Sequence, residues 1–243
     1  MKNINFSKLF TRSSKEFALF PLDKAGWPEE WGTVYYKDYP RMPKVSFSQD
    51  EKPRADLFSL IEERKSQRNF SKEPITLREL SHLLYYSAGV IATPDGYYKR
   101  AHPSGGGRYP IETYLIVNRD TELKNGLYHY NPKSHSLDVL WEHDFIREEM
   151  DALIVAGDGW AKEAPFLIIM TATFWRSQNK YGERGLRFAL LEAGHIGQNF
   201  LLAGTALGLR LCPTGGTLDY GVEKLLDIDG QTEGVVYAIA VGK

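Results

Sequence analysis

Five consecutive residues, Arg64-Lys65-Ser66-Gln67-Arg68, carry three cations and a hydroxyl. Guanidinium groups bind phosphate oxygens through paired hydrogen bonds, so this segment is a candidate site for a phosphate or an anionic ring. The same residues could instead be the basic C-terminus of a helix, where cations offset the helix dipole. On composition alone, the helix terminus is the more common explanation.

Two glycine-rich turns could present backbone N–H groups to a ligand. The first is Pro103-Ser104-Gly105-Gly106-Gly107-Arg108-Tyr109-Pro110, in which three glycines stand between two prolines. Such a run is costly in chain entropy and leaves N–H groups bare for a flat or anionic ligand. We therefore predict a ligand loop there, a plain glycine turn being the alternative. Pro213-Thr214-Gly215-Gly216 is a similar turn and a candidate partner.

Lys180 and Tyr181 are adjacent at the entrance to a long predicted helix, and Glu183, Arg184 and Arg187 follow them. Solvated charges at a helix start are the ordinary explanation of such a group. The alternative is a proton-transfer pair, which requires a lysine that burial keeps partly neutral. The residues alone favour the ordinary explanation.

Several other kinds of site are excluded. The glycine run carries Pro110 where a dinucleotide-binding fingerprint has its third glycine, and it precedes a predicted strand, not a helix. The sequence has neither a phosphate-binding loop ending in Gly-Lys-Ser/Thr nor a His-Glu-x-x-His motif. Its six histidines lack the spacing of metal ligands. We therefore expect no metal site.

Composition bounds the class of protein. The chain has 243 residues, 42% of them hydrophobic, which suits one large domain or two small ones with a sizeable core. Its net charge of −1 gives no long-range attraction to nucleic acid, so we expect no nucleic-acid partner. Cys212 is the only cysteine, which excludes a disulfide within the chain and is typical of a reducing cytosol.

The hydropathy pattern predicts no membrane partner. The longest apolar run, around Phe166 to Trp175, is much shorter than the roughly 20 residues of a membrane-spanning helix. The first residues also lack the apolar core of a secretory signal. We therefore expect a cytoplasmic protein.

The elements that must position these residues follow from periodicity and caps. We expect helices over 55–63, 76–89, 145–155, 182–207 and 220–226, the second beginning with a capping box of Thr76 and Glu79. Strands are expected over 113–117, 127–130, 137–141, 166–172 and 235–241, the first two joined by a turn at Asn125-Gly126. Small residues in the long helix (Gly194, Gly197, Ala203 and Gly204) indicate a helix–helix or subunit contact. The fold class is α+β, with helices around a mostly antiparallel sheet.

We divide the chain into two parts. Residues 1–54 form an N-terminal arm, since prolines and aromatic residues between 21 and 54 disfavour a helix and need a surface to pack on. Residues 55–243 form the main domain.

Taken together, the motifs resemble the SagB-type dehydrogenases, the azoline-oxidising branch of the FMN-dependent nitroreductase-like superfamily. The resemblance covers nearly the whole chain in the family's order. Its motifs are Tyr39-Pro40, Arg64-x-Ser66-x-Arg68, Thr76–Leu84 with Gly89, Pro103–Pro110 with Glu112, Gly126–Tyr130, Lys180-Tyr181 with Arg184, Arg187 and Phe188, Glu192–His195, and Gly215-Gly216. The family's glycine loop usually reads Pro-Ser-Ala-Gly-Ala-Leu-Tyr-Pro, so this chain departs from it with Gly105, Gly107 and Arg108.

The resemblance implies a nitroreductase-like fold and a homodimer with two FMN molecules at the subunit interface. By family pattern, the flavin's phosphate, ribityl chain and pyrimidine edge would be contacted by Arg64, Lys65, Ser66 and Arg68. The loop of the other subunit would contact the ring through Pro103, Ser104, Gly105 and Gly106. Thr214, Gly215 and Gly216 would approach the ring near N5 and O4.

The implied activity is oxidation of thiazoline or oxazoline rings, or of a similar bond, in a modified peptide to the azole. Lys180 and Tyr181 match the family's Lys-Tyr pair. They would remove the Cα proton while flavin N5 accepts hydride from Cβ, and dioxygen would reoxidise the flavin. One alternative is a reductase that passes hydride from NAD(P)H to nitro-aromatics or quinones. Another is a non-catalytic, flavin-bearing partner of a peptide-modifying complex, possible because the arm could dock on a cyclodehydratase.

Overall fold

A seven-stranded antiparallel sheet forms the centre of the computed structural model, which describes residues 6–15, 24–48, 51–92 and 98–243. The strand order is β1-β6-β5-β4-β7-β9-β8. The strands are β1 (Lys44–Ser46), β4 (Ile111–Val117), β5 (Gly126–Asn131), β6 (Ser136–Glu142), β7 (Phe166–Thr173), β8 (Arg210–Thr214) and β9 (Glu233–Gly242). A separate hairpin is formed by β2 (Val90–Ala92) and β3 (Tyr98–Arg100).

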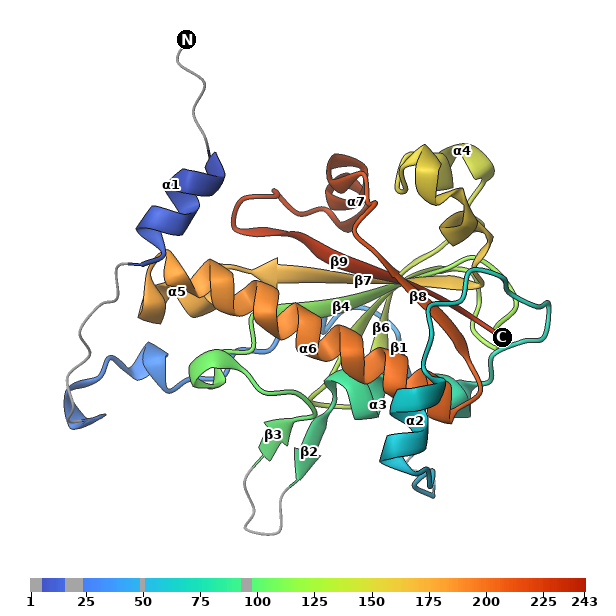
Figure 1. The fold of residues 1–243 in the computed structure, drawn as a ribbon, viewed down its shortest axis with the longest axis horizontal. Coiled ribbons are helices and arrows are strands. Elements are labelled where there is room, and N and C mark those ends of the chain that lie inside the picture. Colours follow the sequence, from blue (N-terminus) through green and yellow to red (C-terminus); the bar gives the residue numbers. More distant parts are fainter. Residues whose placement is uncertain (1–5, 16–23, 49–50, 93–97) are drawn as a thin grey trace.

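Helices flank this sheet (Figure 1). The α-helices are α1 (Phe6–Ser13), α2 (Leu57–Glu63), α3 (Leu77–Ala88), α4 (Arg147–Asp151), α5 (Trp175–Tyr181), α6 (Arg184–Ala206) and α7 (Asp219–Leu226). Short 3₁₀ helices are η1 (Lys24–Gly26), η2 (Glu29–Trp31), η3 (Gly105–Gly107) and η4 (Ala156–Glu163). The predicted α+β class with an antiparallel sheet flanked by helices is confirmed. Among the described residues, no helix is both long and apolar enough to cross a bilayer.

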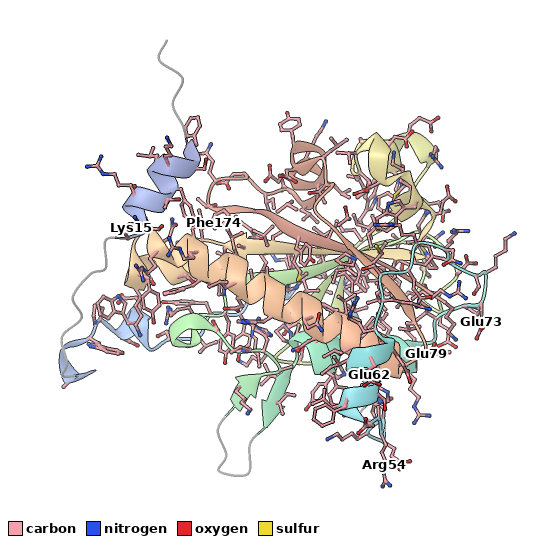
Figure 2. The ribbon with its side chains drawn as sticks, in the orientation of Figure 1. Lys15, Arg54, Glu62, Glu73, Glu79 and Phe174 are labelled. Atoms are coloured by element: carbon pink, nitrogen blue, oxygen red, sulfur yellow. The ribbon has the colours of Figure 1, made fainter. Side chains whose placement is uncertain are left out.

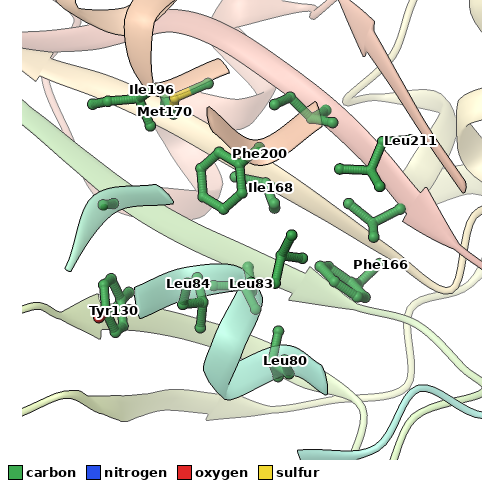
Figure 3. Packing of buried hydrophobic residues seen from close by; sticks show 14 of the residues in the cluster. Leu80, Leu83, Leu84, Tyr130, Phe166, Ile168, Met170, Ile196, Phe200 and Leu211 are labelled. Atoms are coloured by element: carbon green, nitrogen blue, oxygen red, sulfur yellow. The ribbon is translucent and has the colours of Figure 1, made fainter. Parts of the chain in front are cut away.

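The core has two layers because alternate residues of a strand face opposite sides of a sheet. In β7, Phe166, Ile168 and Met170 pack against α3 and α6 (Figure 3). Leu167 and Ile169 face the other way, toward α4, η4 and α7. Since both faces are covered, β7 is buried along its whole length, which explains its continuous apolar sequence.

The start of α3 confirms the predicted capping box. The Thr76 hydroxyl accepts a hydrogen bond from the Glu79 backbone N–H at 3.2 Å, and the Glu79 carboxylate accepts one from the Thr76 backbone N–H at 2.8 Å. This arrangement satisfies two N–H groups that a helix terminus otherwise leaves unpaired. It fixes the helix whose Leu80, Leu83 and Leu84 fill the core.

The glycines of α6 have a different role from the predicted helix–helix or subunit contact. A Cβ at Gly197 would lie 2.7 Å from the ring of Tyr237 in β9, and a Cβ at Gly204 would overlap Leu211 in β8. These two glycines therefore allow α6 to approach the sheet, and the prediction is wrong for them. Gly194 is exposed with open space above it, so it is available for a subunit contact.

Three local predictions are wrong. The link between β4 and β5 covers residues 118–125, and Gly126 lies inside β5, where a Cβ would overlap the Trp141 carbonyl oxygen. The helix expected over 145–155 is reduced to α4, at Arg147–Asp151. The long helix is preceded by a separate α5, which ends at Gly182 with φ +54°. Lys180 and Tyr181 therefore belong to the end of α5, not to the start of α6.

The N-terminal segment is attached to the main body at several points. Arg184 Nε donates a hydrogen bond to the Ser14 carbonyl oxygen at 3.0 Å, and Arg187 donates one to the Ser14 hydroxyl. Further along, β1 pairs with β6 and forms one edge of the sheet. Residues ahead of α2 therefore contribute to the sheet itself as well as lying on its surface.

Candidate functional site

Tyr181 lies against the glycine loop, and the Lys180 ammonium lies 5.6 Å from the Tyr181 ring centroid. We call this group, together with Trp27 and Trp31, the lysine site. A Cβ at Gly106 would overlap the Tyr181 hydroxyl. The Tyr181 ring also meets Phe188 edge-on, with ring centroids 4.9 Å apart. A Cβ at Gly105 would lie 3.2 Å from Phe188. Two segments predicted separately from the sequence thus meet in one place.

Lys180 is buried, and Tyr181 is half-buried. Lys180 is only 7% exposed, and its ammonium lies 4.2 Å from the ring centroid of Trp27. Burial raises the pKa of Tyr181, while the nearby Arg108 guanidinium acts in the opposite direction. Tyr181 is therefore a neutral phenol at pH 7 that can donate its proton in a hydrogen bond.

The glycine loop is held in a conformation that only glycine adopts without strain. Gly106 and Gly107 have φ of +65° and +66°. Ser104 closes the loop, because its carbonyl oxygen accepts from the Gly107 N–H at 3.1 Å and its hydroxyl accepts from the Tyr109 N–H at 2.8 Å. Of the glycine amides that the sequence suggested were bare, that of Gly107 is thus used within the loop.

This loop gives a matched pair of variants. Gly107→Ala adds a methyl group in open space, so only its positive φ is penalised, and we expect about 1–2 kcal/mol of destabilisation. Gly106→Ala has the same φ penalty and also overlaps the Tyr181 hydroxyl, so we expect a further loss of about 1–3 kcal/mol. Urea unfolding measures both. Equal losses in the two variants would show that Tyr181 does not contact the loop in solution.

The cationic segment and the second glycine turn both contact η4, and we call them together the arginine face. The Arg68 guanidinium lies 5.3 Å from the ring centroid of Trp160. The Thr214 hydroxyl donates to the Asp158 carboxylate and accepts from the Gly216 N–H, the latter at 2.8 Å. Trp160 and Asp158 are both in η4.

The cations of this face are accessible. Lys65, Ser66 and Arg68 are exposed, and Arg64 is half-buried at the C-cap of α2. The Gln67 N–H donates to the Leu211 carbonyl oxygen at 2.9 Å, which aligns the segment with β8. A Cβ at Gly215 would meet nothing within 4 Å, so space is open in front of the turn. The segment is thus an extended chain leaving α2, and only Arg64 caps the helix.

Within one chain, the lysine site lies beside the start of α6. The cationic segment leaves α2, which lies beside the other end of α6. Figure 2 shows Phe174, which directly precedes α5, beside the start of α6, and Glu62 of α2 beside its other end. At 1.5 Å per residue, a helix of 23 residues is about 35 Å long. The structure therefore brings the predicted residues together as two groups, not as one.

Sequence reasoning assigned no role to a buried charge network beside the lysine site. His129 is fully buried, and its ring nitrogens lie 2.9 Å from a Glu112 oxygen and 3.1 Å from an Asp138 oxygen. Arg176 donates to Glu112, and Lys44 donates to Asp138. Burial acts to raise the pKa of Glu112, but the hydrogen bond from His129 and the charge of Arg176 outweigh it and lower the pKa to about 2. Two residues of the network, Glu112 and His129, are in the motifs that carry the family resemblance, which was the available signal.

Arg108 is the other residue whose role the sequence did not reveal. Its side chain is completely buried and donates four hydrogen bonds to backbone carbonyl oxygens. Burial lowers its pKa, and nearby Tyr35 opposes this effect. Within the described part of the chain, no group of three or more His, Cys, Asp or Glu side chains is placed to hold a metal ion.

Three curated proteins resemble this chain. The putative nitroreductase MJ1384 of Methanocaldococcus jannaschii is 34% identical over 172 residues, covering 71% of this chain and 84% of its own. The trifolitoxin-processing protein TfxB of Rhizobium leguminosarum is 32% identical, covering 69% of this chain but 47% of its own length. The microcin B17-processing protein McbC of Escherichia coli is 29% identical, covering 72% and 69%.

Solved structures share the fold. A putative nitroreductase from Anabaena variabilis matches 97% of this chain and 45% of its own, with a TM-score of 0.69 and 28% identity. A chain of the E. coli microcin synthetase McbBCD complex, solved with truncated pro-MccB17 bound, matches 98% of this chain and 91% of its own, with a TM-score of 0.60 and 21% identity. A putative nitroreductase from Desulfovibrio desulfuricans, solved in complex with FMN, matches 79% and 87%, with a TM-score of 0.52 and 19% identity.

The family model for nitroreductases matches residues 61–243, which contain the glycine loop, the lysine pair and the arginine face. With three quarters of its residues inside that match, and with a relative 34% identical over most of both chains, this protein belongs to the nitroreductase family.

Proposed function

We propose that this protein is an FMN-dependent oxidase or dehydrogenase of the SagB type, which oxidises thiazoline or oxazoline rings in a modified peptide to azoles. Its relatives TfxB and McbC are named for processing trifolitoxin and microcin B17. One observation in this chain carries the proposal. The shielded Lys180 lies 5.6 Å from the ring centroid of Tyr181, whose hydroxyl lies against Gly106 of the glycine loop, so a base and a proton donor are adjacent beside a loop suited to a flat cofactor.

The residues of the arginine face fit FMN. Exposed Lys65 and Arg68, with half-buried Arg64, offer donors to a phosphate, and the Ser66 hydroxyl is accessible to a ribityl chain. The open space before Gly215 suits the approach of a ring edge near Thr214 and Gly216. Reduction of a flavin places negative charge on its N1–C2=O edge, and a cation there favours the reduced state.

The separation of the lysine site from the arginine face supports a homodimer. A flavin held by the arginine face of one subunit would meet Pro103, Ser104, Gly105 and Gly106 of the other. Apolar surface is available for such an interface. Three apolar residues of α2 are more than half exposed: Leu57, Phe58 and Ile61. In α6, Leu190 is 47% exposed and Leu191 is 56% exposed. The exposed Gly194 lies on the same helix.

In this proposal, Lys180 in its neutral amine form takes the proton from Cα of the ring, and Tyr181 stays a phenol whose hydroxyl donates a hydrogen bond beside it. Bound FMN would supply the two-electron acceptor for the hydrogen that leaves Cβ, with dioxygen as the final oxidant. The chain itself contributes shielding, since Lys180 is 7% exposed, and it fixes the Tyr181 hydroxyl against Gly106. Both features favour proton transfer to a positioned group over exchange with solvent. A cyclodehydratase complex is the proposed partner, because the fold matches a chain of the McbBCD complex.

An absorbance spectrum of the purified protein, with mass spectrometry of the released cofactor, tests the first step. We expect a yellow protein, FMN in the released fraction, and a dimer by sedimentation. Candidate azoline peptides should then lose two hydrogens in air. A colourless monomer that cannot be reconstituted with FMN would contradict the proposal.

The similarity to MJ1384 favours a second candidate, an NAD(P)H-dependent nitroreductase or quinone reductase. The two functions differ in the electron donor. Rapid bleaching of the bound flavin by NADPH without oxygen would support the reductase, whereas bleaching by an azoline peptide alone would support the oxidase.

A further inference from the structure

The N-terminal segment encloses the Lys180 ammonium. Its nitrogen lies 4.2 Å from the ring centroid of Trp27 and 5.9 Å from that of Trp31. The two tryptophans meet edge-on, 5.8 Å apart, and the Trp31 indole N–H donates to the Asn179 carbonyl oxygen at 3.1 Å. An ammonium over the face of tryptophan is attracted by the ring's negative charge. The rings therefore fix the position of the lysine as well as covering it.

The enclosure depends on one buried guanidinium. Arg108 donates to the carbonyl oxygens of Glu30, Trp31 and Thr33 at 2.6, 2.7 and 3.1 Å. Its Nε donates to the carbonyl oxygen of Arg176, in α5, at 2.9 Å. Arg108 makes no ion pair with the described residues, so its planar fork of donors is used entirely to bind backbone. It ties η2 to α5, the helix whose last turn carries Lys180.

Arg108 directly follows the three glycines, so a single residue joins the glycine loop, the N-terminal segment and α5. A leucine at this position, as the usual family loop has, could not donate to any of these carbonyl oxygens. The departure from the family pattern is thus paired with a local feature that needs an arginine.

We propose that Trp27 and Trp31 are positioning residues for Lys180, and that Arg108 holds them in place. This inference rests on the proposed function where it makes Lys180 a proton-transfer group, but the enclosure is measurable without turnover. In this arrangement the residues ahead of the family's matched region complete the lysine site. These residues limit the access of molecules other than the substrate to the Lys180 amine.

Competitive labelling of amines with acetic anhydride, read by mass spectrometry on the FMN-loaded protein, tests the enclosure. Trp27→Leu should raise the labelling rate of Lys180 roughly tenfold, and Trp27→Phe, which keeps a weaker ring face, only about two- to threefold. Trp175→Leu is the matched control, because Trp175 contacts Tyr35 at 4.9 Å and is part of neither the enclosure nor the proposed catalytic pair. It should leave the rate within about twofold.

If Arg108→Leu folds, it should raise the labelling rate of Lys180 as Trp27→Leu does. If it does not fold, the labelling rates of the tryptophan variants alone test the enclosure. In Trp27→Leu, kcat should fall roughly tenfold at unchanged FMN content, and Trp27→Phe should recover most of it. Labelling of Lys180 in Trp27→Leu at the rate of the Trp175→Leu control would overturn the enclosure. Full turnover by Lys180→Ala would instead overturn the proposed proton-transfer role and leave the labelling result standing.

Discussion

Lys180→Ala should lower kcat for azoline oxidation roughly a thousandfold while the protein stays yellow, since positioned proton transfer contributes about 10²–10⁴ in rate. The variant removes the amine that lies against Trp27 and leaves the arginine face unchanged. FMN content, from the flavin absorbance, and turnover, from the two-hydrogen mass loss, are measured on the same sample.

Lys162→Ala is the matched control for this experiment. Lys162 is also largely covered, with its side chain 6% exposed, but it pairs with Asp151 at 2.6 Å, away from the lysine site. Its loss should leave kcat within about twofold. Tyr181→Phe keeps the ring against Phe188 and removes only the hydroxyl, so a partial loss is expected. Retained turnover in Lys180→Ala would remove this lysine from the mechanism.

Glu112→Leu should destabilise the protein by about 3–5 kcal/mol, because it leaves buried cations without their counter-charge. Glu112 is 2% exposed, and it accepts hydrogen bonds from Arg176 and His129. Urea unfolding gives the loss of free energy. Glu142→Gln is the control: this residue pairs with Lys124 on the surface, with both side chains more than half exposed, and its loss should cost less than about 1 kcal/mol. Similar losses for the two variants would mean that the buried network is not formed.

The same network predicts a stability that falls on both sides of an intermediate pH. The pKa of Glu112 is lowered to about 2, so its contribution is full above the unfolded value of 4.5 and is lost as pH falls toward 2. For His129, burial acts to lower the pKa, but hydrogen bonds to Asp138 and Glu112 outweigh it and raise the pKa. Its contribution is therefore full below the unfolded value of 6.5 and is lost as pH rises through the folded value. His129→Gln should remove the loss on the alkaline side, as measured by unfolding free energies between about pH 4 and 9.

Much of the fold could be predicted because its signals are local. The capping box of α3 and the apolar runs of β7 and β9 are readable from a few adjacent residues. The edge strands were missed for a physical reason. β1 has three residues, and β8 contains Pro213, which weakens a strand pattern while remaining compatible with an edge position. Asn125-Gly126 has the composition of a tight turn, yet Gly126 is needed where a Cβ would overlap the Trp141 carbonyl oxygen, a contact between strands that no local pattern reveals.

For the candidate site, too, local features could be predicted from the sequence and long-range contacts could not. Its segments could be selected from residue types, and the positive φ of Gly106 agrees with the predicted special role of that glycine. The contact between Gly106 and Tyr181, some 75 positions apart in the sequence, depends on the packing of α5 against α6 and could not be foreseen. Arg108 was an unexplained departure from the family pattern because its partners are backbone carbonyl oxygens, which every residue has.

The pairing of β1 with β6 also protects the protein against aggregation through an open strand edge. Lys44, Val45 and Ser46 lie opposite Asp138, Leu137 and Ser136, and the Val139 N–H donates to the Pro43 carbonyl oxygen at 2.8 Å. A chain trimmed to the 61–243 region would leave these β6 backbone groups open, beside a buried leucine. An uncovered strand edge of this kind is a template for intermolecular pairing and aggregation. The residues ahead of position 61 thus cover the edge of the sheet at β6. Their removal should convert a protein that stays in solution into one that aggregates and precipitates.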